Sequence, residues 1–261
     1  MTTPAGPGPV IPRQRSWHRH RRSPGVALDL GSDRTRAWMS GRRTILDVPT
    51  VTFPGAGPSY PVRRGTIVDS DGTARMLHRL LGHRLPRVGR PLLILTTPAL
   101  GGTAYRTAAR AAVQILRPRT VLTVPTARAV AAATEADLTR PLLVLDLGAQ
   151  LTEVTLLVDG AVTDARTTAL GTSDLDGRTP PSRISDAVVA MVSAMLEQDR
   201  TVQTLDALRR GALLAGGGAL RPDITYPLAG RLHAPVQPVP APHTAAVRGA
   251  ASLLRSADFS S

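Results

Sequence analysis

The sequence carries the same acidic turn twice, as Asp29-Leu30-Gly31 and as Asp146-Leu147-Gly148. Each copy follows a short apolar run and leads through a polar turn into a second apolar run. A tight glycine turn presents backbone N–H groups that can cradle phosphate oxygens, and an aspartate at a strand end can hold a hydrated Mg²⁺. Two opposed turns of this kind would clamp one polyphosphate, with Asp29 and Asp146 holding Mg²⁺ through water.

Three successive glycines, Gly216, Gly217 and Gly218, follow a further apolar run. Glycine lets a flat ring lie directly on the backbone, because it has no side chain to hold the ring away. Taken alone, the three residues are explained equally well as a flexible turn. After two phosphate-type turns they favour an adenosine contact.

Several kinds of chemistry are excluded by residue types that the chain lacks. It contains no cysteine and no lysine, which excludes a disulfide scaffold, a thiolate metal site and a Schiff-base lysine. Ser32 has no partner base, so a hydrolase nucleophile is not expected there. The histidines at positions 78, 83, 233 and 243 show no paired metal spacing.

Apolar runs that alternate with helical patterns predict an α/β fold. The expected strands are residues 26–30, 35–39, 92–95, 121–124, 142–145, 153–158 and 212–215. The expected helices are residues 72–81, 103–116, 127–136, 184–196 and 243–254. Because aromatic residues make up only 3% of the 261 residues, the core must be aliphatic. The repeated strand–turn–strand unit predicts two similar domains that face each other.

The net charge of +13 comes from arginine, and part of it is concentrated near the N-terminus. Residues 1–24 are rich in proline and contain a basic cluster at 13–22 around Trp17, which predicts a disordered basic tail. A second interpretation is an anchor on an anionic membrane surface, since basic residues and Trp favour that interface. No run is long enough to span a bilayer and no signal peptide is recognised, so a cytoplasmic location is expected. Nucleic acid is not an expected partner, because no pattern of aromatic and basic residues recurs downstream.

Together these motifs resemble the actin-like ATPase superfamily, and most closely the bacterial MreB/Mbl family. The resemblance rests on residues 29–32 and 146–148 as the two phosphate loops and 216–220 as the adenosine loop, and its order holds across 25–254. It implies a duplicated, ribonuclease H-like fold around a nucleotide cleft. The ATP-binding residues that it implies are Asp29, Gly31, Ser32, Asp146, Gly148, Thr152, Gly216, Gly217 and Gly218.

The resemblance also implies a division of the chain. Domain I spans 25–140, with its outer subdomain trimmed to a loop near 51–61. Domain II spans 141–242, with its outer subdomain missing near 173–182. A C-terminal helix over 243–255 returns to domain I.

Two departures from the family pattern bear on catalysis. Ala149 and Gln150 stand where the family has glycines, and Val124 precedes Pro125 where the family has an acidic residue that positions the attacking water. Because phosphoryl transfer depends on positioning and charge stabilisation, both changes predict weak ATP hydrolysis or none.

The leading functional hypothesis is an MreB/Mbl-like protein in cell-shape or cell-envelope organisation. Its expected partners are further copies of itself or other actin-like proteins, and envelope-synthesis proteins. The alternatives within the superfamily are a sugar kinase or exopolyphosphatase, and a chaperone-type ATPase related to the seventy-kilodalton heat-shock proteins. The first pair needs extra substrate-binding segments and the last needs a substrate-binding domain, and the short chain is expected to hold neither.

Overall fold

The computed structural model describes residues 24–259 except 43, 56 and 86–88. The predicted basic tail over 1–24, which includes the basic cluster at 13–22 interpreted as a membrane-surface anchor, lies outside the described residues apart from Pro24. Among the helices described, none combines the length and the apolar character needed to cross a bilayer.

The first half of the chain forms a five-stranded sheet in the order β3-β2-β1-β6-β7. Its strands are β1 (Gly25–Leu30), β2 (Arg34–Met39), β3 (Leu46–Pro49), β6 (Leu92–Thr97) and β7 (Thr120–Pro125). The first three strands are antiparallel neighbours, whereas β6 and β7 run parallel to β1. The apolar run of β1 is buried because this strand is central and covered on both faces.

The second half repeats this topology strand for strand, in the order β10-β9-β8-β11-β12. Its strands are β8 (Leu142–Leu147), β9 (Thr152–Val158), β10 (Ala161–Thr168), β11 (Ala212–Ala215) and β12 (Val236–Pro238). Here too the first three strands are antiparallel neighbours and the last two run parallel to β8. The predicted α/β fold with duplicated halves is confirmed.

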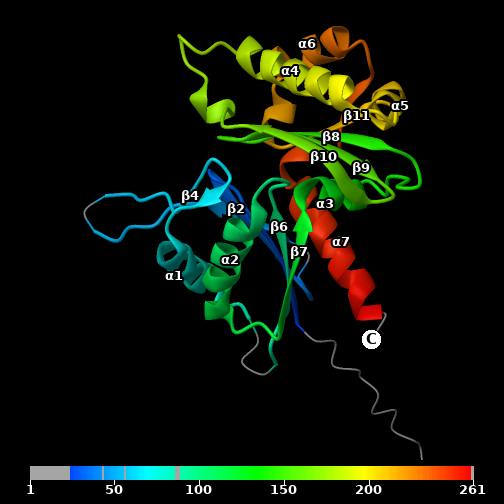
Figure 1. Cartoon of the computed structure of the whole chain (residues 1–261). Coiled ribbons are helices and arrows are strands. Elements are labelled where there is room, and N and C mark those ends of the chain that lie inside the picture. The colour runs from blue at the N-terminus through cyan, green and yellow to red at the C-terminus, as the bar shows by residue number, and fades with distance from the viewer. Residues whose placement is uncertain (1–23, 43, 56, 86–88, 260–261) are drawn as a thin grey trace, which may run out of the picture.

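Helices cover the outer face of each sheet (Figure 1). On the first sheet they are α1 (Ser70–Leu81) and α2 (Gly102–Val113), and on the second α4 (Ser182–Gln198), α5 (Gln203–Arg210) and α6 (Pro222–Leu232). The α1 helix begins after Asp69, whose carboxylate accepts a hydrogen bond from the Gly72 N–H and caps the helix. These faces supply the large aliphatic clusters of the two halves.

The sequence analysis does not predict several segments that the structure forms. They are β3, β10, β12, α5, α6 and the short hairpin of β4 (Val62–Arg63) and β5 (Thr66–Ile67). Within 51–61, Thr52 and Ser59 pair in an isolated antiparallel bridge. Helix α6 carries Pro227 in its interior, a residue that normally argues against a helix.

Two helices join the halves, and the second of them runs along the first sheet (Figure 1). The first, α3 (Thr126–Ala133), packs Val130 and Ala131 against the second sheet, and the second, α7 (Ala245–Phe259), packs Val247 and Leu254 against the first. The two helices also pack on each other. The relative position of the halves therefore depends on the α3–α7 contact.

Gly249 makes this contact possible, and we expect Gly249→Ala to destabilise the protein. A Cβ atom at position 249 would lie 1.6 Å from the carbonyl oxygen of Ala129, so the α3 backbone would have to move. Overpacking of this kind costs about 1–3 kcal/mol, which outweighs the gain of up to about 1 kcal/mol from alanine in a helix. Urea unfolding measures the difference.

Gly230→Ala in α6 is the matched control, because a Cβ atom there meets nothing within 4 Å. It should raise the free energy of unfolding by about 0.5–1 kcal/mol. Equal stability of the Gly249→Ala variant and the wild type would mean that α3 and α7 tolerate a wider separation.

Candidate nucleotide cleft

The two Asp-Leu-Gly turns have the same hydrogen-bonded geometry. The Gly31 N–H donates to the Arg34 carbonyl at 3.1 Å, and the Gly148 N–H donates to the Leu151 carbonyl at 2.9 Å. A Cβ atom at either glycine would lie 2.8 Å or 2.7 Å from that same oxygen. Both turns therefore need glycine for one local reason, and the sequence repeat is a structural repeat.

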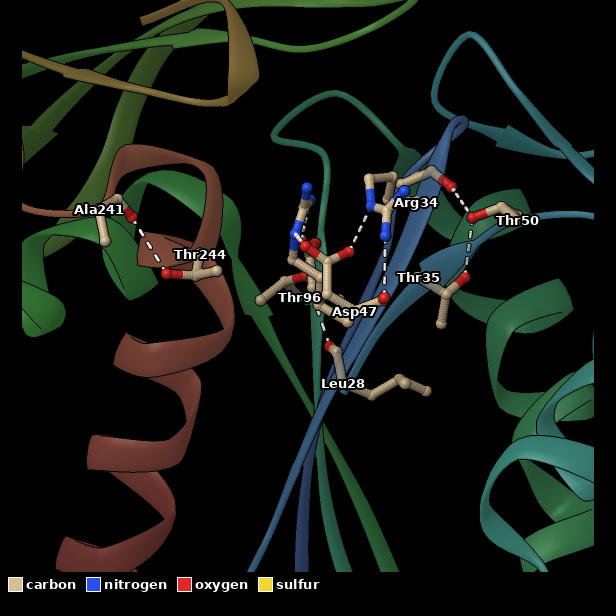
Figure 2. A network of polar contacts seen from close by, with 11 residues as sticks. Leu28, Arg34, Thr35, Asp47, Thr50, Thr96, Ala241 and Thr244 are labelled. Atoms are coloured by element: carbon tan, nitrogen blue, oxygen red, sulfur yellow. Dashed lines mark hydrogen bonds and ion pairs between the residues drawn. The ribbon is translucent and has the colours of Figure 1, made fainter. Parts of the chain in front are cut away.

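The glycine carbonyl of each turn also accepts a hydrogen bond from another segment. The Thr50 hydroxyl donates to the Gly31 carbonyl at 2.8 Å and lies 2.9 Å from the Thr35 hydroxyl, a network that Figure 2 shows. At the second turn, the Thr172 N–H donates to the Gly148 carbonyl at 3.1 Å. These bonds fix the direction of both turns.

A cavity of about 200 Å³ lies between the halves, with residues from both in its lining. Five of the predicted residues line it: Asp29, Asp146, Gly148, Gly216 and Gly217. The side chain of His243 lines the cavity as well, and its buried Nδ1 has no hydrogen-bond partner among the described residues. The cavity is smaller than the roughly 300–1,000 Å³ of typical ligand pockets, so a nucleoside triphosphate needs the halves to separate somewhat.

The other four predicted residues are not among the described residues that line the cavity. They shape the turns around it. Gly31 closes the first turn, and the Ser32 hydroxyl accepts a bond from the Gly65 N–H at 3.5 Å. Thr152 is fully buried and donates to the Leu170 carbonyl at 2.8 Å. Gly218 packs on Leu147, where a Cβ atom would come within 2.7 Å of the leucine side chain.

Gly216 is the most constrained of the three loop glycines. Its φ of +84° is one that residues with side chains rarely adopt, and a Cβ atom there would lie 2.3 Å from the Leu147 carbonyl and 2.5 Å from Asp146 Oδ1. Its N–H donates to the Pro242 carbonyl at 3.1 Å. The third loop is thereby pressed against the second turn, with no room for a side chain at Gly216.

The two predicted aspartates both line the cavity, Asp29 from the first half and Asp146 from the second. Burial raises the pKa of Asp29, although the Thr96 hydroxyl, which donates to Asp29 Oδ1 at 2.7 Å, opposes that rise. Burial raises the pKa of Asp146 to about 7, with a further contribution from the charge of Asp29. The cleft therefore brings together carboxyl groups whose ionised forms it disfavours, and a phosphate bound beside them would need a cation.

Sequence reasoning missed Glu153, a third carboxyl group at the same place. It pairs with Asp146 in the β8–β9 register and accepts a hydrogen bond from the Ala99 N–H of the other half at 2.9 Å. Burial, and then the charge of Asp146, raise the pKa of Glu153 to about 8. Strand alternation could have placed Glu153 next to Asp146, but only with the strand register known.

Sequence reasoning also missed Arg34 and Arg36, which both line the cavity. Along β2 they alternate with residues that face the core. Arg34 Nε contacts Asp47 Oδ1 at 2.6 Å, as Figure 2 shows, and Arg36 Nε contacts Asp47 Oδ2 at 3.2 Å. Arg36 also lies 3.9 Å from Asp29 Oδ2.

Val124 lies next to Thr96 in the β6–β7 register. Its side chain is 7% exposed and packs in an apolar cluster with Ala129 and Val247 of the joining helices. It is not among the described residues that line the cavity. The valine thus serves the packing between the halves at this position.

Arg64 forms a second bridge between the halves, from the β4–β5 hairpin to the second turn. The Arg64 guanidinium contacts Asp174 Oδ1 at 2.6 Å, and the backbone N–H of Arg64 donates to Gln150 Oε1 at 3.2 Å. Gln150, which stands where the MreB/Mbl pattern has a glycine, therefore contacts the opposite half.

Arg64→Ala should loosen this bridge with little loss of stability. The ion pair is partly exposed, so its removal costs up to about 1 kcal/mol. We expect faster hydrogen–deuterium exchange at residues 148–151 and 172–174. The exposed neighbour Arg63 is the control, since Arg63→Ala leaves the bridge intact. Unchanged exchange in the Arg64 variant would show that the bridge does not restrain the turn.

Two halves of one topology, joined by paired helices and closed around twin glycine turns, define an actin-like fold. MreB5 of Spiroplasma citri bound to ADP has a TM-score of 0.78 and 14% sequence identity to this chain, and the match covers 91% of this chain and 98% of that one. The MamK double helical filament has a TM-score of 0.73 and 14% identity over 90% and 99% of the two chains. The ethanolamine utilization protein EutJ from Carboxydothermus hydrogenoformans has a TM-score of 0.60 and 15% identity over 88% and 89%. No family model and no curated protein matches the chain by sequence.

Proposed function

We propose that this chain is a nucleotide-binding, actin-like protein that associates with further copies of itself and hydrolyses ATP slowly or not at all. The observation that carries the proposal is the single cavity to which Asp29, Asp146 and Gly216 all contribute. If the two turns served only folding, Asp29, Asp146 and Gly216 would not all need to line one cavity.

The comparisons support nucleotide as the ligand. MreB5 of Spiroplasma citri is solved with ADP and with AMPPNP. In this chain the first turn and the second turn would hold the phosphates, and the loop over 216–218 would hold the adenosine. The unpaired Nδ1 of His243 offers a hydrogen-bonding group toward the same ligand.

Slow hydrolysis follows from the chemistry of the cleft. Val124 has no group that can orient a water, and the side chains of Ala149 and Gln150 occupy the second turn. Because hydrolysis depends on a positioned nucleophile, binding can persist without turnover. Robust phosphate release by the wild type, lost in Asp146→Ala, would contradict this part of the proposal.

Self-association is the second part of the proposal, and the MamK filament supports it, because its fold covers 90% of this chain. A role in cell-shape or envelope organisation, as in the MreB/Mbl family, is the physiological role we favour. Envelope-synthesis proteins, and an anionic membrane surface bound through 13–22, would be its partners.

The test is sedimentation of the full chain with and without ATP, with phosphate release followed in the same samples. We expect ATP to move protein into the pellet without matching release of phosphate. Turnover that depends on an added sugar or polyphosphate would favour the enzyme hypothesis. Protein that stays in the supernatant with and without ATP would contradict self-association.

A further inference from the structure

An arginine already stands where the cleft needs a cation. Along one face of the first sheet, the register places Asp29 of β1, Arg36 of β2 and Asp47 of β3 in a transverse row. The guanidinium of Arg36 lies between the two carboxylates, 3.9 Å from Asp29 Oδ2 and 3.2 Å from Asp47 Oδ2. Its side chain is only 14% exposed.

Arg34 precedes Arg36 by two residues on β2 and contacts the same aspartate. Its Nε contacts Asp47 Oδ1 at 2.6 Å, and its Nη2 donates to the Asp47 carbonyl at 2.8 Å. Asp47 therefore holds both guanidinium groups in place. Each guanidinium carries five N–H donors, and these contacts with protein use only some of them.

The surroundings of Asp29 fit a divalent cation poorly. The Thr96 hydroxyl occupies Asp29 Oδ1 at 2.7 Å, and the positive charge of Arg36 faces Asp29 Oδ2. A hydrated Mg²⁺ near this carboxylate would meet a guanidinium that repels it. Among the described residues no group of three or more histidine or acidic side chains is placed to hold a metal ion.

A phosphate in this cleft nevertheless needs a positive partner, because Asp29 and Asp146 both line it. Arginine is suited to that task, since its planar fork matches phosphate oxygens in pairs. Arg34 and Arg36 line the same cavity from one strand. Their charge is available without any ion from solution.

We propose that Arg36, assisted by Arg34, neutralises the phosphates of a bound nucleoside diphosphate or triphosphate, so that binding does not depend on a divalent cation. This inference rests on the proposed nucleotide function. The alternative is the Mg²⁺ held through water by Asp29 and Asp146.

The test is calorimetric titration of the full chain with ADP and with ATP, once in MgCl₂ and once in EDTA. We expect the two dissociation constants for each nucleotide to agree within about threefold. Loss of about tenfold or more in EDTA would overturn the inference and leave the proposed function standing. Absence of binding in both solutions would overturn the proposed function itself.

Variants of Arg36 supply a second readout that does not depend on absolute affinity. Arg36→Gln removes the charge beside Asp29, so we expect binding to weaken about tenfold in EDTA and to recover in MgCl₂. Arg36→Lys keeps a charge and should stay insensitive to EDTA. Arg119→Gln, at an exposed position outside the cavity lining, is the control and should match the wild type. An Arg36→Gln variant that folds, by circular dichroism, and shows no new metal dependence would contradict the inference.

Discussion

Replacing Glu153 with glutamine is expected to stabilise the unliganded protein by a few kcal/mol at pH 8 and to leave its stability unchanged near pH 4. Glu153 is 6% exposed, and its carboxyl group accepts a hydrogen bond from the Ala99 N–H of the other half. Glutamine keeps an oxygen for that hydrogen bond and carries no charge. The variant therefore removes the cost of the buried acid without removing its contact.

The sign of this effect follows from the direction of the pKa shift. Burial raises the pKa of Glu153 from 4.5 to about 8 in the folded protein. Below pH 4.5 both states hold the proton, so the group makes no difference there. Between pH 4.5 and 8 the unfolded chain releases the proton while the folded chain retains it, and stability falls as the pH rises. Each pKa unit corresponds to about 1.4 kcal/mol.

Urea unfolding at a series of pH values measures this difference. The wild type should lose stability between pH 4.5 and 8, and Glu153→Gln should lose less of it. The exposed Glu197 is the control, because Glu197→Gln should stay within about 0.5 kcal/mol of the wild type at every pH. Parallel pH profiles for the wild type and Glu153→Gln would mean that Glu153 is ionised in the folded protein.

Gly216→Ala should have the second large effect, a loss of nucleotide affinity of at least about tenfold. Alanine is strained at the φ of +84°, and its Cβ would lie 2.3 Å from the Leu147 carbonyl. Since that carbonyl belongs to backbone next to Asp146, the third loop must move away from the second turn. The shape of the adenosine side of the cavity is then lost. Titration with ADP measures the change.

Gly217 provides the matched control for the folding of this variant. It lines the same cavity, yet a Cβ atom at position 217 meets nothing within 4 Å. Gly217→Ala should therefore fold like the wild type and unfold at the same urea concentration. If Gly216→Ala bound ADP as tightly as the wild type, the loop over 216–218 would not contact the ligand.

The architecture was open to prediction because its signals are local. A buried strand that ends in Asp-Leu-Gly needs glycine because the glycine N–H donates to the carbonyl three residues later. Both turns show this hydrogen bond. Repetition of the same local pattern then predicts the duplication. Helices α1, α2 and α4 carry strong apolar periodicity, so they could be placed before their packing was known.

The charged part of the site was not open to prediction in the same way. Arg36 acquires its position from the register of β2 with β1 and β3, and Glu153 from the register of β9 with β8. Register depends on pairing between segments that the sequence alone does not align. Arg64 contacts Asp174, more than a hundred positions away in sequence, and no local pattern predicts that contact.

The central claim is that nucleotide binds between the two halves, and hydrogen–deuterium exchange of the full chain with and without ATP tests it most directly. We predict slower exchange in three separate segments at once: residues 30–36 of the first half, 147–152 of the second turn, and 215–218 of the third loop. Protection confined to one half, or no protection at saturating ATP, would contradict the claim.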